Sequence, residues 1–285
     1  MKANSRMIVT FSAVILLPAC LAEGALLKDV PYVTASDDAS RVERCKLDVR
    51  TPDATNFSTV VWFHGGGLTG GSKAFIPIDP KIAQVAANYR LMKEGNGVQG
   101  ENCIDDAAAA VAWTLKHISD YGGDPKKVFV SGMSAGGYLT MMVGMAPKYL
   151  AAYGFSPKDL AGLVPISGQA TKHFNVRKFA GDREPQFLPK IDDLAPLRWA
   201  SADIPPILSV CGEPPWEWKC RSEENRLLIA TCTALGHKNA YFVCVPYCSH
   251  GRAYRAGTPY VEMFVQGRMP KNLVRPEEAC VRDGK

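Results

Sequence analysis

The stretch Val128-Phe-Val-Ser-Gly-Met-Ser134-Ala-Gly-Gly-Tyr138 decides the fold that we expect for this chain. The apolar and β-branched residues at its start are typical of a buried strand, and the mostly apolar run that begins at Tyr138 is typical of a buried helix. Between the two lies Gly-Met-Ser-Ala-Gly, whose small residues suit a very sharp turn, because a larger side chain would collide with neighbouring backbone. The pattern predicts a nucleophile elbow that exposes Ser134 at the top of a sheet.

A second glycine-rich stretch, His64-Gly-Gly-Gly67, comes directly after the run 58–63. That run is almost entirely apolar or β-branched, as expected of a strand covered on both faces of a parallel sheet. Glycines in the following loop would let backbone N–H groups turn toward a developing oxyanion, an approach that side chains would block. We therefore predict an oxyanion loop in which His64 holds the backbone by hydrogen bonding.

Two other interpretations of this loop fail on its context. The Gly-x-Gly-x-x-Gly pattern that begins at Gly65 matches a dinucleotide fingerprint, but that motif requires a helix at its last glycine, and Pro77 and Pro80 follow instead. A phosphate-binding P-loop requires lysine where Ser72 stands. We therefore expect no organic cofactor.

Length and composition favour one large α/β domain. The chain has 285 residues, of which 47% are hydrophobic and 21% charged, which is typical of a globular protein. Strand-like and helical runs alternate, which predicts a mostly parallel central sheet with helices on both faces. We place an N-terminal tail at residues 21–42 and a single domain at residues 43–285. A segment at about 169–204, without clear periodicity and rich in Pro, Arg and Lys, is expected to form a small cap.

The first twenty residues have the features of an export signal. Two basic residues precede an apolar run, Met7–Leu17, which is too short to span a bilayer permanently. Leu17-Pro-Ala-Cys20 resembles a bacterial lipobox, which would lipidate Cys20 and tether the protein to a membrane. Cleavage near Ala22 or Gly24 would instead release a soluble protein. In either case we expect a periplasmic or extracellular protein. The net charge of +5 is too small to predict nucleic-acid binding.

Asp105 and Asp106 are predicted to have a structural role. They lie in the first turn of a helix expected from about Cys103 to Ser119 and capped by Asn102, where the helix dipole favours negative charge. Adjacent residues on a helix point in divergent directions, so the two carboxylates are not expected to act as a catalytic pair.

A serine nucleophile at neutral pH needs a base, and the base needs a third group to orient it and balance its charge. After an elbow serine, the acid is expected beyond the penultimate core strand and the histidine beyond the last one. His250 is the histidine that follows the last strand-like run, 240–246. Two candidates for the acid follow the run 206–212. We favour Glu217 over Glu213, because Glu217 lies between two tryptophans that would shield it from water.

The motifs together carry a resemblance to a known family. They are His64-Gly-Gly-Gly, Asn88-Tyr-Arg-Leu, Asp106-Ala-Ala-Ala-Ala-Val-Ala-Trp, Tyr121-Gly-Gly-Asp-Pro, Gly132-Met-Ser-Ala-Gly-Gly and His250-Gly. In this order they resemble the α/β-hydrolase superfamily, and within it bacterial carboxylesterases of the hormone-sensitive-lipase and feruloyl-esterase-like groups. The resemblance extends over about residues 43–267.

The resemblance implies Ser134 as nucleophile, His250 as base, and the N–H groups of Gly65, Gly66 and Ala135 as oxyanion donors. Many members of the superfamily place an aspartate where this chain has Pro215, so the resemblance leaves the choice between the two glutamates open. The expected activity is hydrolysis of a small-molecule or polysaccharide-linked carboxylic ester through an acyl-enzyme. A peptidase or amidase, or a non-catalytic binding protein of the same fold, are the alternatives.

The cysteine content fits an oxidising compartment, since nine cysteines are many for a cytosolic enzyme. Cys244, Cys248 and His250 match no structural zinc spacing and lack a second pair of ligands, so we expect no metal site. If the loops that carry the acid and the histidine lie side by side, Cys220 and Cys248 come close. We therefore hypothesise a disulfide between them.

Overall fold

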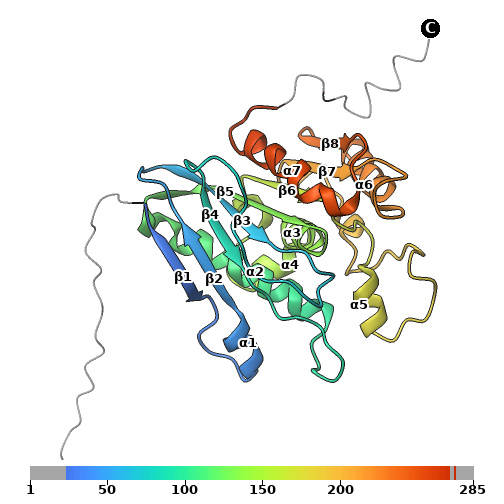
Figure 1. The fold of residues 1–285 in the computed structure, drawn as a ribbon, viewed down its shortest axis with the longest axis horizontal. Helices are drawn as coiled ribbons and strands as arrows, with labels where there is room; N and C mark the ends of the chain where they lie inside the picture. The colour runs from blue at the N-terminus through green and yellow to red at the C-terminus, as the bar shows by residue number, and fades with distance from the viewer. Residues whose placement is uncertain (1–23, 270–272, 274–285) are drawn as a thin grey trace, which may run out of the picture.

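One sheet organises residues 24–269 and 273, which are the residues that the computed structural model describes (Figure 1). Its strands, in spatial order, are β1 (Leu26–Pro31), β2 (Lys46–Arg50), β4 (Ala83–Ala87), β3 (Phe57–Phe63), β5 (Gly123–Met133), β6 (Gly162–Ile166), β7 (Ile207–Gly212) and β8 (Ala240–Val245). Strand β2 is antiparallel to both of its neighbours, and every other pair is parallel. The predicted mostly parallel sheet is confirmed.

Helices connect the strands. They are α1 (Ala39–Arg44), α2 (Gly100–His117), α3 (Ala135–Met145), α4 (Pro147–Ala151), α5 (Phe174–Phe179), α6 (Arg221–Ala234) and α7 (His250–Val265), with short 3-10 helices η1 (Ile118–Tyr121), η2 (Pro157–Asp159) and η3 (Pro196–Trp199). Among the described residues, no helix is long and apolar enough to cross a bilayer.

Both faces of the sheet are buried, as the sequence predicts. Alternate residues of a strand point to opposite faces, so Val61 and Phe63 of β3 join the core under α2, α3 and α6, whereas Val60 and Trp62 join a second core under α7. The loops that follow the parallel strands then meet at one edge of the sheet, where α/β proteins bind their ligands.

The N-terminal boundary predicted for the domain is wrong. Residues 26–31, assigned to a tail, form the edge strand β1, which pairs with β2, and α1 follows within the same segment. Most β1 side chains are exposed, and Asp29 has a φ of 54° at an irregularity in the pairing. An exposed edge strand of this kind lacks the apolar alternation by which strands are recognised.

Two helices begin earlier than predicted. Helix α2 begins at Gly100 after the N-cap Gln99. Asn102 is therefore the third residue of the helix, where its side chain completes a capping box, rather than the cap itself. Helix α7 begins at His250, whereas we expected a helix from about residue 258, and it contains Pro259. The early start matters because it places His250 in the first turn of α7.

The segment predicted as a cap contains α5 and η3. Residue Val176 of α5 packs against Gly100 at the start of α2, and the Asn175 side-chain amide donates to the carbonyl oxygen of Gly67 at 2.7 Å. The segment therefore lies against the glycine-rich loop that follows β3. The predicted export signal, with Cys20, lies outside the described residues.

Candidate active site

The turn between β5 and α3 is as sharp as the sequence predicts. Ser134 has a φ of 58° and a ψ of −115°, an unusual conformation for a residue with a side chain, and its N–H donates to the carbonyl oxygen of Ile166. A Cβ on Gly136 would lie 2.0 Å from the carbonyl oxygen of Phe63, and one on Gly132 would lie 2.5 Å from the backbone of Gly136. The glycines on both sides are therefore required by close backbone contacts.

Three side chains predicted from the sequence lie in one line of hydrogen bonds. The His250 Nε2 atom is 2.9 Å from the Ser134 Oγ, and the His250 Nδ1 atom is 2.6 Å from the Glu217 Oε1. Because the carboxylate accepts the proton on Nδ1, Nε2 is left as the acceptor for the serine hydroxyl. In this geometry the imidazole can take the proton of Ser134.

Glu217 is oriented by several donors. It is 6% exposed, and its Oε2 accepts hydrogen bonds from the Ser167 hydroxyl at 2.5 Å and from the N–H of Gly212 at 3.0 Å. Burial raises the pKa of Glu217, but the hydrogen bonds from His250 and Ser167 outweigh burial, so the pKa lies below its ordinary value. The carboxylate is therefore ionised at neutral pH and can stabilise an imidazolium.

Glu213, the alternative acid, is used differently. Its Oε2 accepts a hydrogen bond from the N–H of Tyr247 at 3.1 Å, which joins the loop after β7 to the loop after β8. Among the described residues, Glu217 is the glutamate within hydrogen-bonding distance of His250.

The loop after β3 lies beside the serine. A Cβ on Gly65 would be 3.5 Å from the Cβ of Ser134, and Gly66 has a φ of 105°, in the region that favours glycine. Within residues 24–269, no protein acceptor bonds the backbone N–H groups of Gly65, Gly66 or Ala135. That of Ala135 is free because it begins α3, where the first N–H groups have no partner within the helix. Within the described residues, these three N–H groups are therefore left without a protein acceptor.

His64 holds this loop, as predicted. Its Nδ1 donates to the carbonyl oxygen of Gly65 at 2.7 Å, and its ring stacks on Tyr89 with centroids 4.4 Å apart. The Tyr89 hydroxyl donates to the carbonyl oxygen of His64 at 2.8 Å. Burial lowers the pKa of His64 to about 4, so the ring is neutral near pH 7 and serves as a support rather than as a charge.

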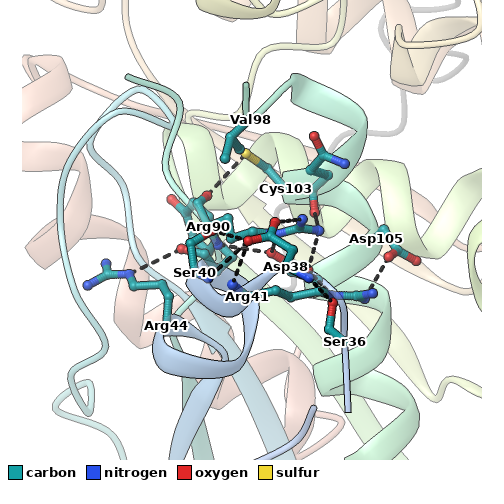
Figure 2. A network of polar contacts seen from close by, with 12 residues as sticks. Ser36, Asp38, Ser40, Arg41, Arg44, Arg90, Val98, Cys103 and Asp105 are labelled. Carbon is teal, nitrogen blue, oxygen red and sulfur yellow. Dashed lines mark hydrogen bonds and ion pairs between the residues drawn. The ribbon is translucent and has the colours of Figure 1, made fainter. Parts of the chain in front are cut away.

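A network of ion pairs surrounds Arg90, the residue that follows Tyr89 in the sequence (Figure 2). Arg90 donates from Nε and Nη2 to the fully buried Asp106 at 2.7 and 2.8 Å, and from Nη1 to Asp38 at 2.8 Å. Arg41 donates to Asp106 as well, at 2.8 Å. The structural role predicted for Asp106 thus rests on two arginines rather than on the helix dipole.

The hypothesised disulfide between Cys220 and Cys248 is not formed. Cys220 is exposed at the N-cap of α6, whereas Cys248 is buried with its Sγ 3.6 Å from the carbonyl oxygen of Ser249. The seven cysteines within the described part of the chain are all free. No group of His, Cys, Asp and Glu side chains within that part is arranged to hold a metal ion.

Sequence reasoning missed two residues of the site. Ser167, which donates to Glu217, directly follows β6 at the edge of the sheet where functional residues gather, and that position was the available signal. Trp218 packs edge-on against the ring of His250 with centroids 5.2 Å apart. The sequence suggested only that the tryptophans would shield Glu217.

Comparisons with known proteins point to esterases. The family model described as BD-FAE matches residues 47–158. Acetylcholinesterase-1 of Trittame loki is 30% identical over 158 residues, which are 48% of this chain and 28% of that protein. The chain thus spans less than a third of that relative's length.

Solved structures show the fold over most of the chain. A carbohydrate esterase from gut microbiota is 20% identical with a TM-score of 0.67, covering 86% of this chain and 96% of that one. A thermophilic esterase from Thermogutta terrifontis is also 20% identical, with a TM-score of 0.63, covering 90% and 96%.

Proposed function

We propose that the chain is an α/β-hydrolase and that it hydrolyses carboxylic esters through an acyl-enzyme formed on Ser134. The observation that carries the proposal is the line of hydrogen bonds from Ser134 through His250 to Glu217, at 2.9 and 2.6 Å. A shared fold alone would not support an activity, whereas this arrangement is what activation of a serine hydroxyl requires.

The proposed reaction uses each group in turn. The Ser134 Oγ attacks the ester carbonyl carbon while His250 Nε2 takes the hydroxyl proton, and Glu217 stabilises the imidazolium. The tetrahedral oxyanion accepts hydrogen bonds from the free N–H groups beside the serine, each worth about 3 kcal/mol of transition-state stabilisation. Collapse of the intermediate expels the alcohol, which takes the proton from His250. Water then attacks the acyl-enzyme by the same steps and releases the acid.

Fluorophosphonate labelling combined with ester turnover tests this proposal. The wild-type protein should be labelled on Ser134 and should hydrolyse p-nitrophenyl acetate, and Ser134→Ala should lose both properties. Ser131→Ala is a matched control on the strand that precedes Ser134, since the Ser131 hydroxyl donates to the carbonyl oxygen of Val164. Turnover by Ser134→Ala above about 1% of wild type would contradict the assignment.

The substrate class is part of the same proposal. Trp216 is 55% exposed in the loop that carries Glu217, and Tyr247 is 75% exposed in the loop that leads into α7 and His250. Exposed aromatic side chains beside a site offer flat apolar surfaces to a ligand. This favours esters of small molecules or of polysaccharides, in line with the carbohydrate esterase among the similar structures. Rates on p-nitrophenyl esters of increasing length, acetylated xylan and feruloyl esters should rank these substrates, with an anilide as the amide comparison.

Export is proposed from the sequence of residues 1–20 alone. A basic start, an apolar run and a lipobox-like Leu17-Pro-Ala-Cys20 support a periplasmic or extracellular protein, tethered through Cys20 if the cysteine is lipidated. Incorporation of labelled palmitate into the wild-type protein, and its loss in Cys20→Ala, would support the tether. Release of an unlabelled protein would support soluble export instead.

A further inference from the structure

Besides His64, whose Nε2 atom is also unpartnered, two buried side chains near the candidate active site have polar atoms without a partner. The Nε and Nη1 atoms of Arg221 and the Nε2 atom of His173 are buried and make no hydrogen bond within the described residues. Arg221 is 4% exposed and His173 is 1% exposed. Leaving a buried donor unsatisfied costs about 1–3 kcal/mol, and more for a charged group, so such atoms call for a missing partner.

The unpartnered atoms of Arg221 and His173 are all hydrogen-bond donors. The Nδ1 atom of His173 accepts a hydrogen bond from the N–H of Asn175 at 3.2 Å, so the ring proton lies on Nε2. Burial, together with the charge of Arg221, holds the pKa of His173 well below its ordinary value, which keeps the ring neutral with one N–H to donate. A guanidinium has donors and no acceptor. The missing partner is therefore an acceptor, and the fixed charge of Arg221 favours an anion.

No carboxylate in the described part of the chain supplies that partner. Within the described residues, Arg221 forms no ion pair, although the charges of Glu224 and Glu217 both act to raise its pKa. The Glu224 oxygens accept from the hydroxyl and N–H of Thr171, and those of Glu217 accept from His250 and its other donors. Removing an arginine from water without a direct partner costs several kcal/mol, which binding of an anion would recover.

The donors lie beside the reaction centre. Arg221 is the first residue of α6, four positions after Glu217, and His173 is the N-cap of α5. The His173 ring stacks on Phe174, with centroids 4.5 Å apart, and Phe174 packs on Trp218 at 5.2 Å. Trp218 in turn packs against His250 at 5.2 Å. One layer of rings thus links the unpartnered donors to the base.

We propose that Arg221 and His173 bind a carboxylate carried by the ester substrate, an inference that rests on the proposed esterase activity. The planar guanidinium can hold a carboxylate at two points through Nη2 together with either Nε or Nη1, and the neutral N–H of His173 adds a third donor. The carboxylate belongs either to the acyl group, as in a half-ester of a dicarboxylic acid, or to the alcohol part. The preferred substrates are therefore acidic esters rather than purely apolar ones.

Two matched pairs of esters test the subsite and locate the carboxylate. The acyl pair is the p-nitrophenyl half-ester of glutaric acid against p-nitrophenyl valerate. The alcohol pair is 4-acetoxybenzoate against 4-acetoxybenzamide. In the wild-type protein, kcat/KM for the acidic member of one pair should exceed that of its neutral partner. In Arg221→Gln this ratio should fall about 10- to 100-fold, as expected for loss of a charge-assisted hydrogen bond.

Arg226→Gln is the matched control, because Arg226 is an exposed arginine of the same helix that lies over the ring of Phe242. Its ratios should equal those of the wild type, and Arg221→Lys should keep part of the preference. The inference is overturned if the wild-type protein prefers the neutral member of both pairs, a result that does not depend on whether Arg221→Gln folds. An unchanged ratio in folded Arg221→Gln would also overturn it. Failure of the esterase proposal is distinguished by the absence of Ser134-dependent hydrolysis of the neutral esters.

Discussion

Replacing Asp106 with asparagine would remove the negative charge that pairs with Arg90 and Arg41 in the ion-pair network next to Tyr89. The carboxylate is fully buried and accepts hydrogen bonds from the N–H, Nε and Nη2 of Arg90 and from the Nε of Arg41, all between 2.7 and 3.0 Å. The Arg90 side chain is only 8% exposed, so it would remain largely buried beside a neutral amide. The amide group would also turn donors toward donors.

The expected loss of stability follows from this burial. Removing one partner of a buried pair costs about 3–5 kcal/mol, because the remaining charge is left uncompensated. For a domain of this size, each kcal/mol lowers Tm by about 2–4 °C, so Asp106→Asn should lower Tm by about 6–20 °C. The neighbouring Asp105 provides a matched control, since it pairs with Arg41 at 2.6 Å but is 35% exposed. Asp105→Asn should cost about 1 kcal/mol or less.

Thermal unfolding followed by circular dichroism at pH 7 measures both variants under the same conditions. Because Arg90 adjoins Tyr89, which supports His64, Asp106→Asn should also lower kcat/KM for p-nitrophenyl acetate well below its own Tm, and Asp105→Asn should not. If the two variants unfold within about 2 °C of each other, the burial argument is refuted, because the size-scaled difference should be larger. A normal kcat/KM in Asp106→Asn would show that the ion-pair network does not support the oxyanion loop.

Three further predictions concern the site itself. Glu217→Gln should lower kcat about 10⁴-fold, because it removes the charge that orients His250 and balances its positive charge. Glu213→Gln should retain most of the activity, since Glu213 bonds Tyr247 instead. Equal losses of kcat in a steady-state assay would contradict this difference. Gly136→Ala should destabilise the fold and the oxyanion loop, because its Cβ would lie 2.0 Å from the carbonyl oxygen that ends β3; Gly251→Ala, with open space around it, should change Tm little. Burial lowers the pKa of His64 from 6.5 to about 4, so the unfolded chain binds more protons between these values. The free energy of unfolding should therefore be highest above pH 6.5 and should fall by about 3 kcal/mol as the pH is lowered to 4. In His64→Gln, Tm should depend less on pH between these two values.

The parts of the site that follow from local sterics could be predicted from the sequence. The sharp turn at Ser134 needs small residues on both sides, and the backbone contacts of Gly132 and Gly136 explain why. His250 could be chosen because it follows the last strand-like run, and the order of the chain sets the order of the loops at the edge of the sheet. Strand β1 was missed because an exposed edge strand is stabilised by pairing with β2 rather than by an apolar pattern of its own.

The sequence by itself therefore determined the α/β class, the elbow at Ser134, the glycine-rich loop beside it and the histidine that follows the last strand. Only the tertiary structure decided which glutamate contacts His250, because Glu213 and Glu217 lie in one loop and have the same chemistry. Their partners come from distant segments: His250 is 33 residues from Glu217 and Ser167 is 50 residues from it. The unpartnered donors of Arg221 also emerge only from folding, since burial depends on what packs around a side chain. Steric limits on a turn act between neighbours and are legible in sequence, whereas hydrogen-bond partners and burial are set by the packing of remote elements.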